Sequence, residues 1–357
     1  MPFAMRSLLI RLVASLLIVC VIGTGYLFWA WNHSLKPGTE IYNVKPGMSL
    51  RAFARELSAR GALPESHSFV WLAHLTGHDR ALKSGEYRFR DGMTASELLD
   101  QVVAGRVIEY PVVLIEGWTF QQFLAVLAEA PKLTHTLSGL SASAIMERLG
   151  HPGEHPEGRF FPDTYYHSTG QTDIMILAKA YDKMQMLLQR EWEGRENNLP
   201  LKNMYEALIL ASIVEKETGR DDERRLIAGV FINRLRHGMR LQTDPTVIYG
   251  MGKMFDGNLR LKDLRRDTPY NTYTRRGLPP TPVAMPGKAS LQAALHPTVT
   301  GAVFFVARGD GSHEFSSTLE EHNKAVLKYQ LKGKLRKTIP PTASDTREQN
   351  SKIKALR

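Results

Sequence analysis

Met204–Thr218, with the sequence MYEALILASIVEKET, is the strongest helix signal in the chain. It is apolar on nearly every side until its last turn, and a helix that is apolar all round belongs inside a protein core. The pattern therefore predicts a central core helix, ended by Gly219 as a C-cap. Two glutamates, Glu215 and Glu217, lie in its last turn. Chemistry at this end of the helix would therefore involve a carboxyl group.

Glu217 follows Leu210 by seven residues and Ile213 by four, so its carboxyl shares a helix face with apolar side chains. Burial disfavours the charged form and raises a carboxyl pKa, which a general acid working near neutral pH requires. Glu215 has Leu208 and Ala211 at the same offsets. The helical period therefore does not choose between the two glutamates, and two solvated carboxylates at a helix end remain the alternative.

Three later segments, 231–250, 270–273 and 277–280, are rich in amide, hydroxyl and aromatic side chains. In the first, a helix is expected to stop at Gly238, and Asp244 is expected to cap a short helix with Pro245 at its first position. Such groups suit a sugar-binding cleft, although the same residues also form ordinary turns. The candidate substrate-binding residues are Asn233, Gln242, Thr243, Asp244, Tyr249, Tyr270, Asn271 and Tyr273.

The amino terminus contains twenty residues without a charge, from Leu12 to Trp31. A helix of that length spans about 30 Å, the thickness of a bilayer's hydrocarbon core. The run is longer than the apolar region of a signal peptide, and its end is bulky rather than small. Because Arg6 and Arg11 precede it, we expect residues 1–11 in the cytoplasm and the chain beyond the anchor exported. The lone cysteine, Cys20, lies in the span, which excludes an intramolecular disulfide and a cysteine-based metal site.

Two strand–turn–helix patterns follow a short polar linker at residues 32–40. The first covers residues 42–57 with Ser49 as helix N-cap, and the second covers 84–105. Together they resemble a LysM-type module, a small fold that binds N-acetylglucosamine polymers. A spacer role is the alternative, because strand–turn–helix patterns are common.

Composition bounds the remaining possibilities. The 357 residues are 43% hydrophobic and 23% charged, which is typical of a globular protein of about two domains. Of the net charge of +10, residues 331–357 carry +6, and this segment is too polar to build a core, so we expect a disordered basic tail at 333–357. The net charge of the remaining residues is ordinary for an enzyme, so no nucleic-acid partner is expected. The histidines and carboxylates between His151 and His167 lack the spacing of a ligand set, so no metal site is predicted.

Several collinear motifs resemble the YceG-like family, over about residues 5–332. They are Ala211–Thr218, Val230–Leu235, Leu241–Gly250, Tyr270–Tyr273, Gly277–Pro280, Glu157–Tyr165 and His322–Asn323. The resemblance implies an α+β fold with a transmembrane helix at 12–31, a LysM-like module within 32–108 and a catalytic domain at 109–332 around the apolar helix. In other members Pro280 is often followed by Gly, where this chain has Thr281.

The resemblance also implies a function. Family members are anchored in the bacterial inner membrane and cut peptidoglycan glycan strands, which makes this chain an expected endolytic lytic transglycosylase with its catalytic domain in the periplasm. The family's catalytic residue is the second glutamate of Glu-Lys-Glu, here Glu217, and no cofactor is expected. Peptidoglycan, the inner membrane and peptidoglycan synthases such as penicillin-binding proteins are the expected partners. The product would be a 1,6-anhydromuramoyl end, and cleavage would terminate elongation of nascent strands.

Two other functions stay open at this point. A hydrolase would need a second carboxyl about 5–9.5 Å from the first, and Glu215, Asp244 and Asp163 are candidates. A non-catalytic, membrane-anchored scaffold that binds peptidoglycan for synthetic enzymes is the alternative from another class. A pyridoxal-phosphate lyase is disfavoured, because the chain is expected to be exported and lacks a glycine-rich phosphate loop.

Overall fold

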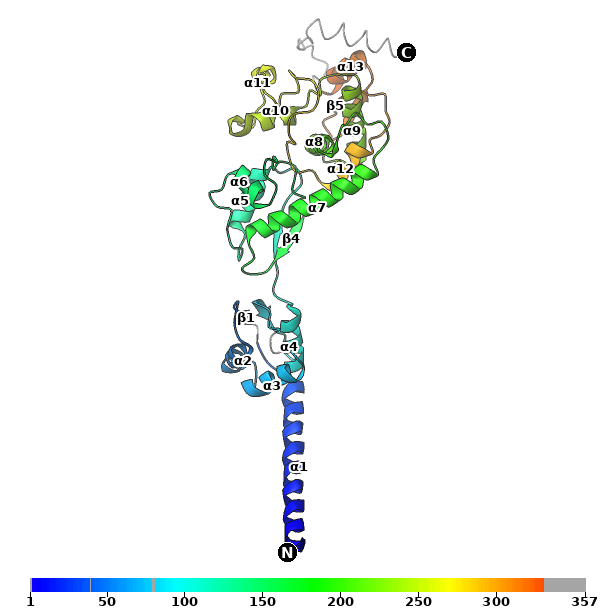
Figure 1. Ribbon diagram of the computed structural model, residues 1–357. Coiled ribbons are helices and arrows are strands. Elements are labelled where there is room, and N and C mark those ends of the chain that lie inside the picture. Colours follow the sequence, from blue (N-terminus) through cyan, green and yellow to red (C-terminus); the bar gives the residue numbers. More distant parts are fainter. Residues whose placement is uncertain (1, 39, 79–80, 331–357) are drawn as a thin grey trace. The chain divides into compact units, whose positions relative to one another are not determined.

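The structure is a computed structural model that describes residues 2–38, 40–78 and 81–330. Its tertiary contacts divide the chain into two compact units (Figure 1). Unit 1 comprises the residues up to Pro111 together with Pro131–Thr134 and Tyr166–Gln171, and unit 2 comprises Val112–Ala130, His135–Tyr165 and the residues from Thr172 onward. The fold is mixed α+β. The predicted basic tail at 333–357 lies outside the described residues.

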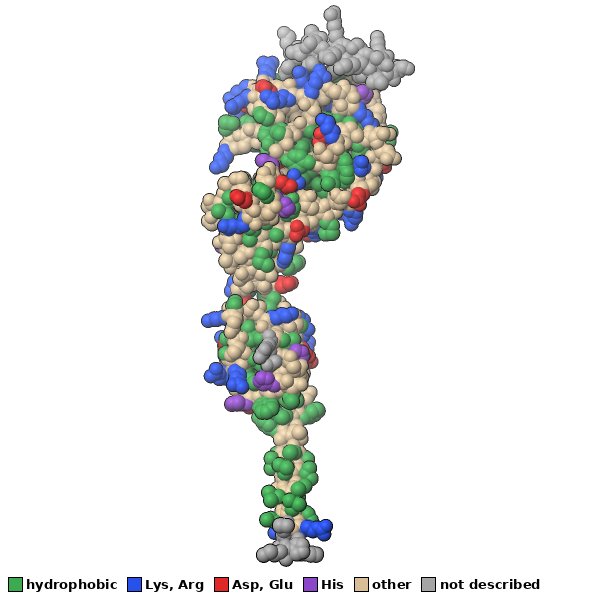
Figure 2. All heavy atoms as spheres, in the orientation of Figure 1, with side chains coloured by type: hydrophobic (Ala, Val, Ile, Leu, Met, Phe, Trp, Pro, Cys, Tyr) green, Lys and Arg blue, Asp and Glu red, His purple; other side chains and the backbone are tan. Residues whose placement is uncertain are grey.

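Unit 1 begins with a long helix, α1 (Pro2–Asn32). Its part from Arg6 to Asn32 is long and apolar enough to cross a membrane, as expected from the charge-free run. Large apolar side chains along it are exposed in the structure, and Figure 2 shows hydrophobic groups over this helix. Exposed apolar groups on this scale are stable only against an apolar surrounding.

The rest of unit 1 packs two short strands and three helices around an aromatic core. They are β1 (Ile41–Val44), α2 (Leu50–Ala59), α3 (Ser66–Leu75), β2 (Gly85–Arg88) and α4 (Ala95–Ala104). The strands pair antiparallel, with Ile41 opposite Arg88. The predicted N-cap Ser49 is confirmed, because its side chain accepts from the backbone N–H of Ala52 at 3.2 Å. The helix α3 was not predicted from the sequence.

Part of the expected linker at residues 32–40 is packed within unit 1. Leu35 is buried in the core, and its backbone exchanges hydrogen bonds with Met93 (2.8 Å) and Gly92 (2.9 Å). The Tyr42 hydroxyl also donates to the Pro37 carbonyl at 3.0 Å. The polar composition suggested a free tether, but one leucine and the backbone groups of the segment hold it in place. The end of α1 is therefore joined directly to the folded unit.

Unit 2 is mainly helical. Two strands, β3 (Tyr110–Val113) and β4 (Thr164–His167), pair with each other. The first helices are α5 (Phe120–Glu129), α6 (Ala142–Arg148) and α7 (Asp173–Glu193). Ser141 caps α6 by accepting from the Ala144 N–H at 3.2 Å. The sequence reading did not predict α7.

The remaining elements of unit 2 surround α8 (Met204–Glu217). They are α9 (Asp221–Arg236), α10 (Asp244–Met251), the 3-10 turn η1 (Gly252–Met254), α11 (Leu261–Arg265), α12 (Lys288–Leu295), the antiparallel hairpin β5 (Phe304–Ala307) and β6 (His313–Ser316), and α13 (Leu319–Tyr329).

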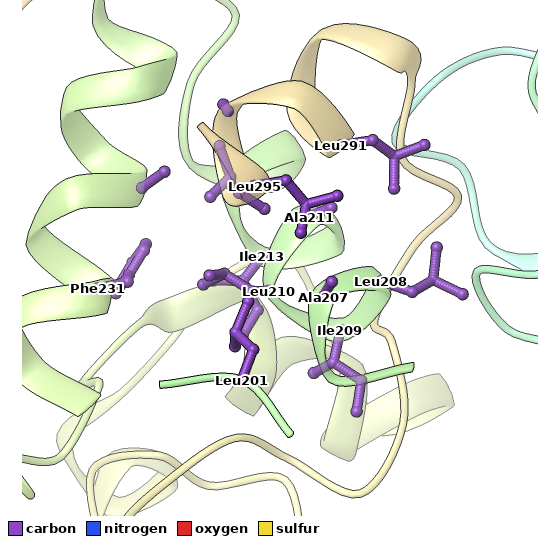
Figure 3. Close-up of a cluster of buried hydrophobic side chains, with 14 of the residues drawn as sticks. Leu201, Ala207, Leu208, Ile209, Leu210, Ala211, Ile213, Phe231, Leu291 and Leu295 are labelled. Atoms are coloured by element: carbon purple, nitrogen blue, oxygen red, sulfur yellow. The ribbon is translucent and has the colours of Figure 1, made fainter. Parts of the chain in front are cut away.

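Every residue of α8 from Ala207 to Val214 is buried, and the helix packs against α7, α9, α10 and α12. Figure 3 shows its leucines and isoleucines among Phe231 of α9 and Leu291 and Leu295 of α12. The one buried hydroxyl of this stretch, Ser212, accepts from the Val283 N–H at 3.0 Å. The core of unit 2 therefore holds α8 rigidly, and with it the glutamates of its last turn.

Candidate active site

Glu217 is the last residue of α8 and is half-buried. The helix ends because Thr218 is extended, with φ −147° and ψ 137°. The predicted C-cap Gly219 is therefore wrong by one residue, and no left-handed glycine is needed at this end. Because the buried residues before Glu217 hold the helix in place, the Glu217 carboxyl has a fixed position at the edge of the core.

Thr243 contacts Glu217 directly. Its hydroxyl donates to Glu217 Oε1, and the Thr243 side chain is only 2% exposed. Two further buried hydroxyls hold Thr243: the Thr272 hydroxyl accepts from the Thr243 N–H at 3.1 Å, and the Thr246 hydroxyl donates to the Thr243 carbonyl at 2.8 Å. Thr246 and Thr272 lie within segments quoted from the sequence, but only their contacts reveal their role. This network orients the single hydroxyl that binds the Glu217 carboxyl.

The pKa of Glu217 is raised above its ordinary value, chiefly because burial disfavours the charged carboxylate. The nearby negative charge of Asp244 raises it further. The hydrogen bond from Thr243 and the positive charges of His313 and Arg234 act in the opposite direction. Glu217 is thus an acid of increased pKa whose ionised form still has specific partners, as a group that gives and takes back a proton requires.

Asp244 is the first residue of α10, whereas the sequence analysis expected it to be the N-cap. Thr243 occupies the cap position, where its side chain makes no capping bond and its hydroxyl donates to Glu217. The Asp244 carboxylate accepts instead from the Tyr273 hydroxyl at 2.5 Å. The pKa of Tyr273 is raised, first by burial and then by the charge of Asp244 and the hydrogen bond to it. Three of the predicted residues, Thr243, Asp244 and Tyr273, are thus brought together with Glu217.

Arg234 is a site residue that the sequence analysis missed. It is buried in α9, where its Nε donates to the Val303 carbonyl at 2.6 Å and its Nη1 to the Leu241 carbonyl at 2.5 Å. Burial lowers the pKa of its guanidinium to about 10, so it is charged at neutral pH. An available signal was its spacing of three and seven residues from the apolar Phe231 and Ile227, which predicts burial of a cation.

His313, on β6, was missed as well. Its Nδ1 lies 2.7 Å from Glu223 Oε2, and its backbone N–H donates to Glu223 Oε1 at 3.0 Å. The position of His313 in the hairpin, far along the chain from α8, left no signal in the local sequence. Its placement near Glu217 comes from the packing of the β5–β6 hairpin on α9 and from Glu223 at the start of α9.

Tyr249 and Tyr270 form a separate pair within unit 2. Their ring centroids lie 5.0 Å apart. The Tyr249 hydroxyl donates to the buried Glu157 at 3.1 Å, and the Tyr270 hydroxyl lies 2.9 Å from the Thr281 hydroxyl. Burial raises the pKa of Glu157 to about 7. Thr281, which departs from the family's usual glycine, is thus a hydrogen-bonding partner of this tyrosine pair.

Two of the predicted residues hold parts of the fold together, and a third is exposed. The Asn233 amide donates to the carbonyls of Thr300 (2.7 Å) and Ala302 (3.0 Å). Asn271 is 0% exposed, and its amide donates to carbonyls at the end of α11, so this side chain has no surface for a sugar. Gln242 is exposed, with a left-handed φ of 52° that is uncommon outside glycine.

The other candidate carboxylates are engaged elsewhere. Glu215 accepts from the Gly287 N–H at 2.9 Å, at the start of α12. Asp163 forms an ion pair with Lys183. Of the three carboxylates considered as partners for Glu217, only Asp244 acts on the Glu217 charge strongly enough to raise its pKa.

The histidines near the start of unit 2 also have local partners. His151 stacks on Tyr181 with centroids 3.9 Å apart, and His155 Nδ1 accepts from the Glu157 N–H at 3.3 Å. Within residues 2–38, 40–78 and 81–330, no group of three or more His, Cys, Asp or Glu side chains is arranged to hold a metal ion.

Comparison with known proteins gives a consistent picture. The model of the YceG-like family matches residues 42–328. A Bacillus subtilis protein named endolytic murein transglycosylase is 31% identical over 306 residues, which are 80% of this chain and 84% of that protein. A Streptococcus pneumoniae protein of the same name is 27% identical, and the match covers 81% of this chain and 50% of that protein. The crystal structure of a yceG-like protein from Listeria monocytogenes is similar with a TM-score of 0.50 and 27% identity, covering 80% of this chain and 99% of that one.

Proposed function

The chain belongs to the YceG-like family, and we propose that it is a peptidoglycan lytic transglycosylase that cleaves glycan strands internally. Relatives that align with about four fifths of the chain carry the name endolytic murein transglycosylase. The observation that carries the proposal is the carboxyl of Glu217, half-buried at the end of α8, with a raised pKa and one oxygen held by Thr243.

In the first step, protonated Glu217 is the general acid. Because Thr243 donates to Oε1, the proton to be transferred is carried by Oε2. It passes to the oxygen of the β-1,4 bond between N-acetylmuramic acid and N-acetylglucosamine. The bond from that oxygen to the muramoyl C1 breaks, the N-acetylglucosamine leaves with the proton, and positive charge develops at C1. The negative charge of Asp244, held by Tyr273, favours this charge development.

In the second step, ionised Glu217 is the base. It takes the proton of the muramoyl C6 hydroxyl, whose oxygen attacks C1 of the same sugar. The product is a 1,6-anhydromuramoyl end, and no water is consumed. Arg234 and His313 stabilise the ionised Glu217 that exists between the two steps, since both lower its pKa. One carboxyl therefore serves in both proton transfers.

The test is mass spectrometry of the fragments that the full chain releases from purified sacculi. Anhydro ends and reducing ends differ in mass by one water, so they report transglycosylation and hydrolysis separately. General acid–base catalysis contributes about 10²–10⁴-fold, so Glu217→Gln should lose at least the upper part of that range, because one group serves both steps. Glu215→Gln is the matched control in the same helix turn and should retain most activity.

Three outcomes would contradict this proposal. Reducing ends alone would make the protein a hydrolase that uses Asp244 as its second carboxyl. Loss of activity in Glu215→Gln with retention in Glu217→Gln would reverse the roles of the two glutamates. Normal glycan length in cells that carry Glu217→Gln would indicate the scaffold function.

The proposal extends to location and partners. We assign residues 12–31 as a single-pass inner-membrane anchor, with 1–11 in the cytoplasm and the catalytic domain, 109–332, in the periplasm. The apolar length of α1 and the arginines before the span support this arrangement. In that position the enzyme acts on nascent strands, ends their elongation and meets peptidoglycan synthases. A reporter fused after the last residue should be active only in its periplasmic form, and cytoplasmic activity would contradict the orientation.

The LysM-like module within 32–108 is proposed to bind glycan weakly, with the anchor supplying the effective concentration. The antiparallel β1–β2 pair with flanking helices is compatible with such a module. The test measures binding of the full chain to sacculi. The weak-binding proposal would be contradicted by tight binding that persists in the Glu217→Gln variant and is lost when the module is altered.

A further inference from the structure

The helix α3 exposes an apolar face that is unusual for a surface helix. Trp71 is 59% exposed and Leu75 is 64% exposed. The helix sequence SHSFVWLAHL contains no Asp, Glu, Lys or Arg. The preceding Glu65 uses its carboxylate to cap the helix, accepting from the Ser68 N–H at 2.7 Å. The exposed side of the helix therefore carries no Asp, Glu, Lys or Arg, and its other exposed side chains include His67 and His74, although the rest of the unit has many charged side chains.

This face is continuous with the contact between α3 and α1. The Trp31 indole of α1 donates to the Ser68 carbonyl at 2.9 Å, and Ala30 beside it is only 2% exposed. Trp71 and Leu75 follow Ser68 by three and seven residues, spacings that place them on one face of the helix. The strip of α3 that meets α1 thus continues into Trp71 and Leu75. Figure 1 shows α3 beside the end of α1.

The level of the membrane follows from α1. About twenty residues are needed to cross the hydrocarbon core, and the charge-free span ends at Trp31. The last turn of that span is already packed in unit 1, because Ala30 is buried there. Aromatic side chains exposed just before it, Tyr26, Phe28 and Trp29, are of the kind that favours the membrane interface. The surface of unit 1 next to α1 therefore lies at the level of the lipid headgroups.

We propose that α3 lies on the outer surface of the membrane that α1 spans, with Trp71 and Leu75 inserted among the lipid headgroups and upper acyl chains. This inference rests on the proposed role of α1 as a membrane anchor. The bilayer is the occupant because the face is continuous with the spanning helix and has no Asp, Glu, Lys or Arg. A tryptophan beside a leucine also suits an interface that is apolar below and wet above, where the exposed His67 and His74 can remain among the headgroups.

The contact would give unit 1 two attachments to the membrane, the spanning helix and the face of α3. The segment after α1 is packed on unit 1 through Leu35, so there is no free tether at this point. Unit 1 is then held against the bilayer in one orientation. A glycan strand could approach it only from the sides that the bilayer leaves open.

The test uses the full chain in nanodiscs of phosphatidylethanolamine and phosphatidylglycerol. In a Cys20→Ala background, Leu75→Cys is labelled with an environment-sensitive fluorophore. Lys45→Cys, in the exposed turn between β1 and α2, is the matched control. Lipids with a nitroxide near the headgroup report membrane contact, and iodide reports contact with water. The unaltered chain labelled at Cys20 reports the anchor itself.

We expect the probe at position 75 to be shifted to the blue, quenched by the nitroxide lipid, and several-fold less accessible to iodide than the probe at position 45. Equal iodide access at both positions would overturn the inference while leaving the anchor intact. Shielding from both quenchers would also overturn it, because a protein surface rather than lipid would then cover α3. A Cys20 probe accessible to iodide would instead refute the anchor, and with it this inference.

Discussion

Replacing Thr243 with valine tests the electrostatic design of the active site. Thr243 is 2% exposed and donates its hydroxyl to Glu217 Oε1. Valine keeps the branched shape, and the backbone bonds that Thr272 and Thr246 make to residue 243 do not depend on its side chain. The substitution therefore removes one donor from the catalytic carboxyl with little other change.

The magnitude follows from the charge of the acceptor. A hydrogen bond to a charged group contributes about 1.5–3 kcal/mol. Ionised Glu217 would lose that stabilisation between the two proton transfers, and since about 1.4 kcal/mol is tenfold in rate, activity should fall about 10- to 100-fold. The donor lowers the pKa of Glu217, so its loss raises the pKa further. Because the first step needs the protonated acid, activity declines as pH rises through this pKa, and the alkaline limb of the profile should move to higher pH.

The assay is release of anhydromuropeptides from sacculi across a range of pH, with circular dichroism as a folding control. Thr243→Ser retains the hydroxyl and should keep both the rate and the position of the alkaline limb. The reasoning would be refuted if the valine variant left the limb in place or moved it to lower pH. It would also be refuted if serine and valine had the same effect.

Three further substitutions test the fold around the site. Burial raises the pKa of Glu157 from 4.5 to about 7, so the folded state binds a proton more tightly than the unfolded state. The free energy of unfolding should therefore fall by about 3 kcal/mol as pH rises from 4.5 to above 7. Thermal unfolding of Glu157→Gln should lack this fall, and a pH dependence equal to that of the unaltered chain would contradict the argument. Asn233→Ala removes an amide that donates to two loop carbonyls and should lower stability by about 1–3 kcal/mol with little change in KM. A large change in KM with unchanged stability would instead indicate that Asn233 contacts the substrate. Gly229→Ala would place a methyl group against the Thr298 carbonyl and should cost about 1–3 kcal/mol by denaturant titration. Gly287→Ala meets only the end of a flexible glutamate side chain, so an equal or greater cost there would refute the argument.

Local patterns in the sequence predicted several elements correctly. The cap at Ser49 is confirmed because a cap depends on a hydroxyl that accepts from a backbone N–H three residues later, which is a local relation. The stop of α9 before Gly238, whose φ is 62°, is confirmed for the same kind of reason. Among the helices that were not predicted, α3 and α7 each have apolar residues at helical spacing.

Other expectations failed because local preference was overruled by a distant partner. Asp244 has a side chain suited to capping α10, but the Tyr273 hydroxyl binds its carboxylate. Asn271 has the chemistry of a sugar ligand, but the carbonyls at the end of α11 occupy its amide. The residues 32–40 have the composition of a linker, but Leu35 belongs to the core of unit 1. The partner of Asp244 is remote in sequence, and the overall polarity of residues 32–40 gives no indication that a single leucine is buried.

The residue pattern alone indicates a carboxyl at the end of a buried apolar helix, because helical periodicity is a property of neighbouring residues. It did not distinguish Glu217 from Glu215, since both have apolar residues four and seven positions earlier. Only the tertiary structure separated them. It brings the Thr243 hydroxyl and the charges of Asp244, Arg234 and His313 to Glu217, while Glu215 binds the backbone of Gly287. The physical reason is that a carboxyl's pKa depends on the charges and donors around it in space, and these come from segments that only the packing of α9, α10 and the β5–β6 hairpin brings near the end of α8.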